Sequence, residues 1–295
     1  MNRKVIIIII AHKEVLTENE KRSLQQCYKV LGSYQTIIVC PEKMNVSTYK
    51  TTYPTADFMF IDPKWQANYR MFNKLKINDG FYKKFKGFKY VLFYELDAWV
   101  FRDELIAWCD KGYDYIGAPW FDLDYNGQQY LNDVGNGGFS LRNINSSLKL
   151  LRSLRYKQAM EKYKYLNWKG LTPRLPRLIR DLIKAKHVPS QLEKTFKNHE
   201  DGFWCRTAPA VLKEFTCNSK ILSLIYDTIV KKTLRIPAAE EAIKFSFEVN
   251  PRLLFEMNNR VLPFGCHAWE KRDIEFWKPF MDAHKFNDKD REVNQ

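Results

Sequence analysis

The stretch VIIIII, residues 5–10, decides the class of fold. Six β-branched residues in sequence leave no polar face, which is typical of a parallel strand covered by helices on both sides. The run is too short for a membrane-spanning helix or a signal peptide, and no small-residue cleavage site follows it. We therefore expect a buried first strand in an α/β protein.

Helix and strand signals alternate after this strand. A helix is predicted over 16–32, where Thr17 is the N-cap, Glu20 completes a capping box and Gly32 ends the helix. A second helical stretch, interrupted by Gly80, is predicted over 65–85, and further strands are predicted at 36–40, 57–62 and 90–97. This order predicts a mainly parallel central sheet flanked by helices.

The chain is basic, and much of the excess charge is local. Its 295 residues contain 48 Lys or Arg against 34 Asp or Glu, for a net charge of +14. Between residues 152 and 186, eleven Lys or Arg face only Glu161 and Asp181, a local charge of +9. We expect 152–187 to be a basic insertion that is helical in parts and interrupted by Pro173 and Pro176. Such a patch favours an anionic partner.

Polar clusters follow several predicted strands, at 11–14, Asp62 and 95–97. Ligands of parallel sheets bind outside the carboxyl ends of the strands. On a strand, Glu95 and Asp97 would point to the same face and could hold a divalent cation. A competing pair, Asp122 and Asp124, precedes Asn-Gly and is better explained as part of a turn.

Three further segments have both a structural and a functional explanation. Glycines at 135–138 form a turn, and they could also let the backbone approach a sugar or phosphate. Glu200 and Asp201 complement the dipole of a helix start, or one of them acts as a general base. His267 is a structural hydrogen-bonding group or a metal ligand. The cysteines lack the spacing of a zinc site.

Taken together, these segments resemble GT-A-fold nucleotide-sugar glycosyltransferases, and more specifically bacterial glycosyltransferase-like domains formerly catalogued as uncharacterised. The resemblance covers residues 90 to 269. It rests on six stretches in a fixed order: YVLFYELDAWVFRDEL, YDYIGAPW, VGNGGFSLRN, HEDGFWC, EEAIKFSFE and PFGCHAW.

The resemblance implies a single GT-A-like domain over 1–269. Its nucleotide-binding half would be 1–110, and its acceptor and catalytic half 111–269, with the basic helical insertion 152–187. A charged surface tail would follow at 270–295. The resemblance further implies a nucleoside-diphosphate sugar as donor, UDP by family habit, and Mn²⁺ or Mg²⁺ as cofactor.

The resemblance also assigns roles to individual residues, which fall into three groups. The metal ligands would be Asp97, Glu95 and His267, although a Glu at the first motif position leaves open whether Glu95 contacts metal or ribose. Asp201 is the preferred base of an inverting enzyme, with Glu200 beside it. Gly137 and Gly138 would lie under the donor sugar and acceptor, and His12 and Lys13 would meet the nucleotide.

The expected partners are the nucleotide-sugar donor and a glycan or lipid-linked acceptor in surface polysaccharide or glycoconjugate synthesis. We expect a cytoplasmic protein with peripheral contact to an anionic membrane through 152–187, because Trp168, Leu171, Leu175, Leu178, Ile179, Leu182 and Ile183 alternate with cations there. No nucleic-acid-binding motif is present. A non-catalytic scaffold, a nucleic-acid-binding protein and a metal-dependent phosphotransferase remain alternatives.

Overall fold

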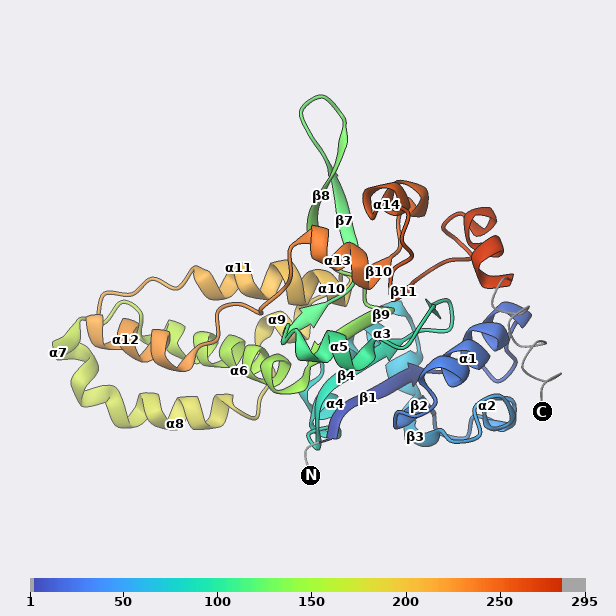
Figure 1. The fold of residues 1–295 in the computed structure, drawn as a ribbon. Helices are drawn as coiled ribbons and strands as arrows, with labels where there is room; N and C mark the ends of the chain where they lie inside the picture. The colour runs from blue at the N-terminus through green and yellow to red at the C-terminus, as the bar shows by residue number, and fades with distance from the viewer. Residues whose placement is uncertain (1–2, 283–295) are drawn as a thin grey trace.

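A computed structural model describes residues 3–282, and it has the expected α/β architecture (Figure 1). A six-stranded sheet has the order β3-β2-β1-β4-β9-β6. Neighbouring strands among β3, β2, β1 and β4 are parallel, whereas β9 is antiparallel to both β4 and β6. The strands are β1 (Arg3–Ile10), β2 (Thr36–Pro41), β3 (Asp57–Ile61), β4 (Phe88–Tyr94), β6 (Tyr115–Ile116) and β9 (Phe139–Asn143).

The isoleucine run forms the buried centre of this sheet. Side chains along a strand point alternately to its two faces, and the two faces of β1 belong to separate hydrophobic layers. Ile6, Ile8 and Ile10 lie in one layer. Ile7 and Ile9 lie in the other. This alternation explains why every position from Val5 to Ile10 is apolar, since each side chain is buried on one face or the other.

One face of the sheet is covered by α1 (Glu18–Leu31), α2 (Ser47–Thr52) and α5 (Leu105–Asp110). The predicted capping box of α1 is present, because the Glu20 N–H donates to Thr17 Oγ1 and the Thr17 N–H donates to Glu20 Oε2. Gly32 is the C-cap, as predicted. The sequence analysis did not anticipate α2.

The other face is covered by α4 (Asp79–Lys83) and α6 (Ile144–Met160), with η1 (Pro63–Gln66) and α3 (Tyr69–Leu75) beside them. The prediction that Gly80 interrupts the helix over 65–85 is wrong. Gly80 lies inside α4, and the break falls at 76–78, where the Asn78 side chain caps the new helix by accepting from the Phe81 N–H.

A helical arm extends from the sheet on the left of Figure 1. Pro173 lies in a 3-10 turn between α7 and α8, as the predicted interruption requires, whereas Pro176 lies in the first turn of α8 and does not interrupt it, because a proline at that position lacks no intrahelical hydrogen bond. The arm and the segment that returns from it contain α6, η2 (Glu161–Tyr163), α7 (Trp168–Leu171), η3 (Thr172–Arg174), α8 (Leu175–Ala185), α9 (Gln191–Thr195), α10 (Glu200–Gly202), η4 (Phe203–Thr207), α11 (Ala208–Lys213) and α12 (Lys220–Ile229).

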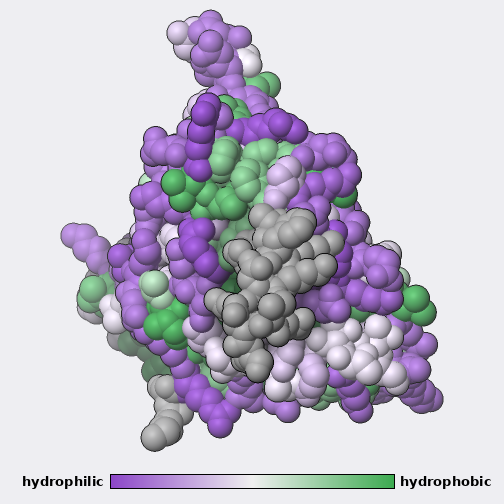
Figure 2. Space-filling model, turned by 45° about the vertical axis from the view of Figure 1, so that its right-hand side comes forward, coloured by the Kyte–Doolittle hydropathy of each residue, from purple (hydrophilic) through white to green (hydrophobic). Residues whose placement is uncertain are grey.

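A hairpin of β7 (Pro119–Leu123) and β8 (Gln129–Val134) projects at the top of Figure 1, and its hydrophilic tip stands clear of the body in Figure 2. The Asp124 carboxylate accepts from the N–H groups of Asn126 and Gln128, each at 2.8 Å. The turn interpretation is therefore confirmed for Asp124, whereas Asp122 lies in β7 and pairs with Tyr130.

A small sheet joins segments that are far apart in the sequence. It has the order β10 (Ser246–Phe247), β11 (Gly265–Cys266), β5 (Trp99–Val100), and Cys266 pairs with Trp99. The helices α13 (Ala239–Phe245) and α14 (Pro251–Met257) flank it in sequence. Because His267 follows β11 and Asp97 precedes β5, this pairing brings both residues to one place.

The expected surface tail at 270–295 needs correction. Residues 274–282 are helical, and Phe276 and Trp277 are buried in a third hydrophobic cluster with Phe101 and Phe247. Burial of these aromatic rings outweighs the charged character of the segment. Residues 283–295 lie outside the described residues. Within 3–282, none of the helices has the length and apolar character needed to cross a bilayer.

Candidate active site

The acidic pair lies in a turn rather than on a strand. β4 ends at Tyr94. The backbone N–H of the next residue, Glu95, donates to Gly138 O at 2.7 Å. The Ala98 N–H donates to Glu95 O at 2.9 Å and closes the turn that contains Asp97. The two carboxylates therefore converge because the chain turns, and not because of the strand alternation that the sequence analysis assumed.

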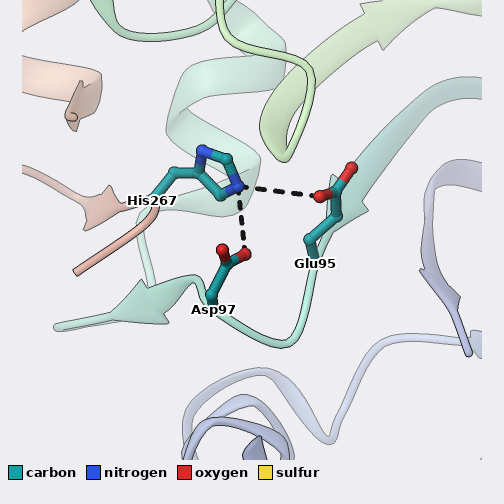
Figure 3. A group of neighbouring side chains, drawn as sticks. All are labelled: Glu95, Asp97 and His267. Atoms are coloured by element: carbon teal, nitrogen blue, oxygen red, sulfur yellow. Dashed lines mark ion pairs between the residues drawn. The ribbon is translucent and has the colours of Figure 1, made fainter. Parts of the chain in front are cut away.

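Glu95, Asp97 and His267 meet at this turn (Figure 3). His267 Nε2 lies 3.0 Å from Asp97 Oδ1 and 3.6 Å from Glu95 Oε2. The three potential ligand atoms lie within 4.8 Å of one another. Two carboxylate oxygens and one imidazole nitrogen form a donor set that suits a divalent cation such as Mn²⁺.

The hydrogen-bonding environment of His267 is consistent with metal binding through Nε2. Nδ1 lies 3.1 Å from Glu248 Oε1, and a carboxylate on the far nitrogen is the usual means of orienting a metal-binding imidazole. Nε2 is buried and has no hydrogen bond of acceptable geometry, although it faces Asp97 and Glu95. A cation bound between the two carboxylates would satisfy this buried nitrogen.

The charges of this cluster depend on one another. Burial opposes ionisation of Asp97, but the neighbouring His267 and Lys271 outweigh it and lower its pKa to about 2. Burial also opposes ionisation of Glu95, yet Lys76 and His267 hold its pKa well below the usual value. For His267, the surrounding carboxylates outweigh burial and raise its pKa. The site therefore presents ionised carboxylates at neutral pH and attracts positive charge.

Gly137 and Gly138 pack directly against the site. A Cβ on Gly138 would lie 2.1 Å from His267 Nε2, and one on Gly137 would lie 2.0 Å from Glu200 Oε1. Both contacts are far inside van der Waals distance. The preceding Asn136 adopts φ 70° and accepts the Gly138 N–H on its side chain at 2.8 Å. The glycines are therefore required by the approach of the backbone to other site residues.

A network of buried charges lies behind the glycines. Arg142 is fully buried and holds Glu200 with two hydrogen bonds, of 2.7 and 2.8 Å. Lys76 is also buried, and its Nζ contacts Glu95 Oε1, donates to Gly137 O at 3.0 Å and lies 3.6 Å from Glu200 Oε1. These contacts occupy the Glu200 carboxylate and favour a structural role over its predicted role beside the base.

Asp201 is in a different environment from its neighbour. Its Oδ2 accepts the Asn136 N–H at 3.0 Å, and its Oδ1 accepts the Gly202 N–H at 2.7 Å. Burial, supported by the negative charge of Glu200, raises the pKa of Asp201. A carboxylate whose pKa moves toward neutrality is suited to accept a proton.

Two cavities meet at the acidic turn. One, of about 590 Å³, lies at the carboxyl end of β1 and is lined by His12, Lys13 and Thr17. The other, of about 500 Å³, is lined by Gly137, Gly138, Glu200, Asp201 and His267. The residues common to both walls are Tyr69, Phe72, Glu95, Asp97 and Lys271. The cavities thus form one cleft with the acidic turn between its two ends.

A family model described as "Protein of unknown function (DUF5672)" matches residues 55–267. The chain belongs to this family. A search among curated proteins finds no match.

Several solved structures are similar to this DUF5672 chain at low identity. The galactosyltransferase LgtC with donor and acceptor sugar analogues is 11% identical over 94% of this chain and 95% of that one, with a TM-score of 0.40. The apo form of mouse xyloside xylosyltransferase 1 is 11% identical over 90% and 97%, with a TM-score of 0.42. The glycosyltransferase GlyE from Streptococcus pneumoniae TIGR4 is 11% identical over 95% and 60%, with a TM-score of 0.42. At these values the likeness carries no argument about activity.

Sequence analysis of the DUF5672 chain missed four residues of the site. Glu248 orients His267, Lys271 Nζ lies 2.9 Å from Asp97 Oδ2, and Lys76 and Arg142 hold the acidic groups behind the glycines. Lys76 lies in the short link between α3 and α4, outside every stretch that carried the resemblance. Arg142 lies in VGNGGFSLRN and Glu248 ends EEAIKFSFE, so both positions were signals in stretches that carried the resemblance.

Proposed function

We propose that the chain is a glycosyltransferase that moves a sugar from a nucleoside-diphosphate donor to a hydroxyl of a glycan or lipid-linked acceptor. The observation that carries the proposal is the cluster of Glu95, Asp97 and His267, in which the two carboxylates line both cavities and His267 lines the second. A cation at that point would face both a diphosphate in the first cavity and a sugar in the second. UDP-sugars are the first donors to test, and glycoconjugate or surface polysaccharide synthesis is the proposed context.

Asp97, Glu95 and His267 would hold the cation. The imidazole in the donor set favours Mn²⁺ over Mg²⁺, because Mg²⁺ prefers oxygen ligands throughout. When bound, the cation would supply Lewis-acid stabilisation of the charge on the departing diphosphate. His12 and Lys13 border the donor cavity, and the Lys13 ammonium is kept in place by Glu20 at 2.7 Å. Lys271 adds a second positive charge on the shared wall.

Asp201 is the proposed general base. The acceptor hydroxyl oxygen attacks the anomeric carbon and forms the new glycosidic bond, while the bond from that carbon to the diphosphate oxygen breaks. The bonding electrons leave with the nucleoside diphosphate, and the hydroxyl proton passes to the Asp201 carboxylate. A single displacement of this kind inverts the anomeric configuration. The raised pKa of Asp201 supports its role, since a stronger base accepts the proton more readily.

Ligand-dependent stabilisation tests the donor and metal parts of this proposal. Binding to the native state raises the apparent melting temperature. We expect a shift with one nucleoside diphosphate, UDP first, that requires Mn²⁺ and is lost in Asp97→Asn. Asp122→Asn is the matched control, because Asp122 is a half-exposed acid in the hairpin. The absence of a shift with UDP, GDP, CMP or ATP would contradict the proposal.

Product analysis tests the transfer itself. A donor that stabilises the protein should yield a glycoside with a defined acceptor, and Asp201→Asn should abolish the yield without abolishing donor binding. The anomeric configuration, measured by proton NMR, decides between inversion and retention. Donor binding without transfer to any acceptor would favour the scaffold alternative, and consumption of a nucleoside triphosphate would favour the phosphotransferase alternative.

A further inference from the structure

A basic face lies at the edge of the sheet opposite the cleft. It is formed by two shallow cavities that share Ser146 and Lys149. One, of about 760 Å³, lies between α6, α8 and residues 228–231, and the other, of about 580 Å³, borders the starts of β1 and β4. We define the basic face by Lys4, Lys86, Lys89, Lys149, Arg152 and Lys186.

Most of these cations have no acidic partner. Lys4 pairs with Asp110, and the adjacent Lys231 pairs with Asp114. For Lys86, Lys89, Lys149, Arg152 and Lys186, the described part of the chain provides no ion pair. The face therefore carries a net positive charge contributed by segments that are distant in sequence. By contrast, Arg155 of the basic insertion is buried between Asp79 and Glu193 and serves the core.

Aliphatic side chains lie among these cations. Ile179 and Ile183 are one helical turn apart on α8, are 57% and 61% exposed, and line the larger cavity with Ile229. Leu178 is buried against the arm, and Leu182 lines the same cavity as the two isoleucines. Helix α8 therefore has one apolar face, and Ile179 and Ile183 form the edge of it that is exposed to solvent.

We infer that the basic face docks onto the surface of an anionic phospholipid bilayer. Lysines and arginines attract anionic headgroups, and isoleucines beside them can enter the boundary between headgroups and acyl chains. A single-stranded nucleic acid would offer phosphates but would be bound with aromatic stacking. The aromatic residues of this face, Phe88 and Tyr156, are half-buried, and its exposed apolar residues are aliphatic. The inference does not depend on the proposed enzymatic activity.

The structure reduces the set of apolar residues that could contact a membrane to fewer than the sequence analysis expected. Of the apolar residues in the insertion, Leu171 and Leu178 are buried, and Leu175 and Leu182 are half-buried against the arm. Trp168 is exposed but lines neither cavity of the basic face, whereas Ile179 and Ile183 are exposed and line the larger one. Strands β1 and β4 begin at the basic face and end at the cleft, so docking through this face leaves the mouth of the cleft free.

Vesicle co-sedimentation tests the inference with the full chain. We expect binding to vesicles of phosphatidylcholine mixed with phosphatidylglycerol, and no binding to phosphatidylcholine alone. Each basic residue near such a surface contributes roughly five-fold in partitioning, so Lys149→Gln with Lys186→Gln should weaken binding roughly 30-fold. The control, Lys43→Gln with Lys50→Gln, removes the same charge from exposed positions on and beside α2 and should change binding by less than about three-fold.

A second variant separates the apolar contribution from the charge. Ile179→Ser with Ile183→Ser should keep binding at low salt and lose it as salt screens the remaining attraction. All six substituted side chains are exposed, so we expect unchanged melting temperatures, which would exclude misfolding as the cause of weaker binding. The inference is overturned if wild type ignores anionic vesicles at low salt, if the control pair loses as much binding as the test pair, or if RNA displaces the vesicles and binds more tightly.

Discussion

The buried pair of Arg142 and Glu200 supports a quantitative prediction about stability. Lys76, Arg142, Glu95 and Glu200 form a cluster in which two positive charges balance two negative ones. Arg142 is fully buried, and Glu200 is 3% exposed. Removing one partner of a buried ion pair leaves an uncompensated charge and costs about 3–5 kcal/mol. We expect a cost of this size for Arg142→Met and for Glu200→Gln.

Urea unfolding followed by tryptophan fluorescence measures this cost. With a slope of about 3 kcal/mol/M, each variant should lower the midpoint by about 1 M or more at an unchanged slope. The double variant should cost about 2 kcal/mol less than the sum of the single variants, because the two residues share the interaction. Glu256→Gln is the matched control. Its partner Arg260 lies at 2.9 Å on the surface, where solvent screens the pair, so we expect no measurable change in the midpoint.

Unlike Arg142→Met and Glu200→Gln, Asp201→Asn should not lower the stability by several kcal/mol. Because the folded protein raises the pKa of Asp201, its ionised form is less stable in the fold than in water at neutral pH. Removing the charge is favourable, but the amide nitrogen of Asn cannot accept one of the two backbone N–H groups that Asp201 accepts, so the urea midpoint should change little while sugar transfer falls by about 10²–10⁴. The reasoning about the buried cluster would be refuted by one result. That result is a loss of unfolding free energy below about 1 kcal/mol for both Arg142→Met and Glu200→Gln, as small as in the surface control.

Three further predictions concern the metal cluster and the core. Glu248→Gln should weaken Mn²⁺ binding about 10–100-fold in calorimetry, because it loosens His267; an unchanged affinity would show that His267 needs no such support. Gly138→Ala should abolish Mn²⁺ binding by displacing His267, whereas Gly87→Ala, where a Cβ meets nothing within 4 Å, should keep it; equal affinities would contradict the packing argument. Asp79→Asn should cost at most about 2 kcal/mol at neutral pH. Burial opposes ionisation of Asp79, but Arg155 and Lys83 outweigh it and lower the pKa to about 2 in the folded protein. The contribution of Asp79 is therefore complete above its unfolded pKa of about 4 and is lost as the pH falls toward 2; a cost independent of pH over that interval would argue against the ion pair.

The sequence alone determined the features that depend on local patterns. An uninterrupted isoleucine run requires cover on both faces, and this fixed the parallel sheet. The capping box of α1 and the turn at Asp124 depend on residues within four positions of one another. The position of Glu95 and Asp97 after an apolar strand was also visible, because the ends of parallel strands gather at one edge.

Only the tertiary structure decided which charges meet. His267 reaches Asp97 because β11 pairs with β5, and this pairing joins segments about 170 positions apart in the chain. The same applies to Glu200, whose adjacent partner in sequence, Asp201, has a different environment because Arg142 neutralises only one of the two. A charge has the same sequence signature whether it is solvated, paired or catalytic. Its role follows from the distance to its partners and from burial, and both quantities exist only in the folded chain.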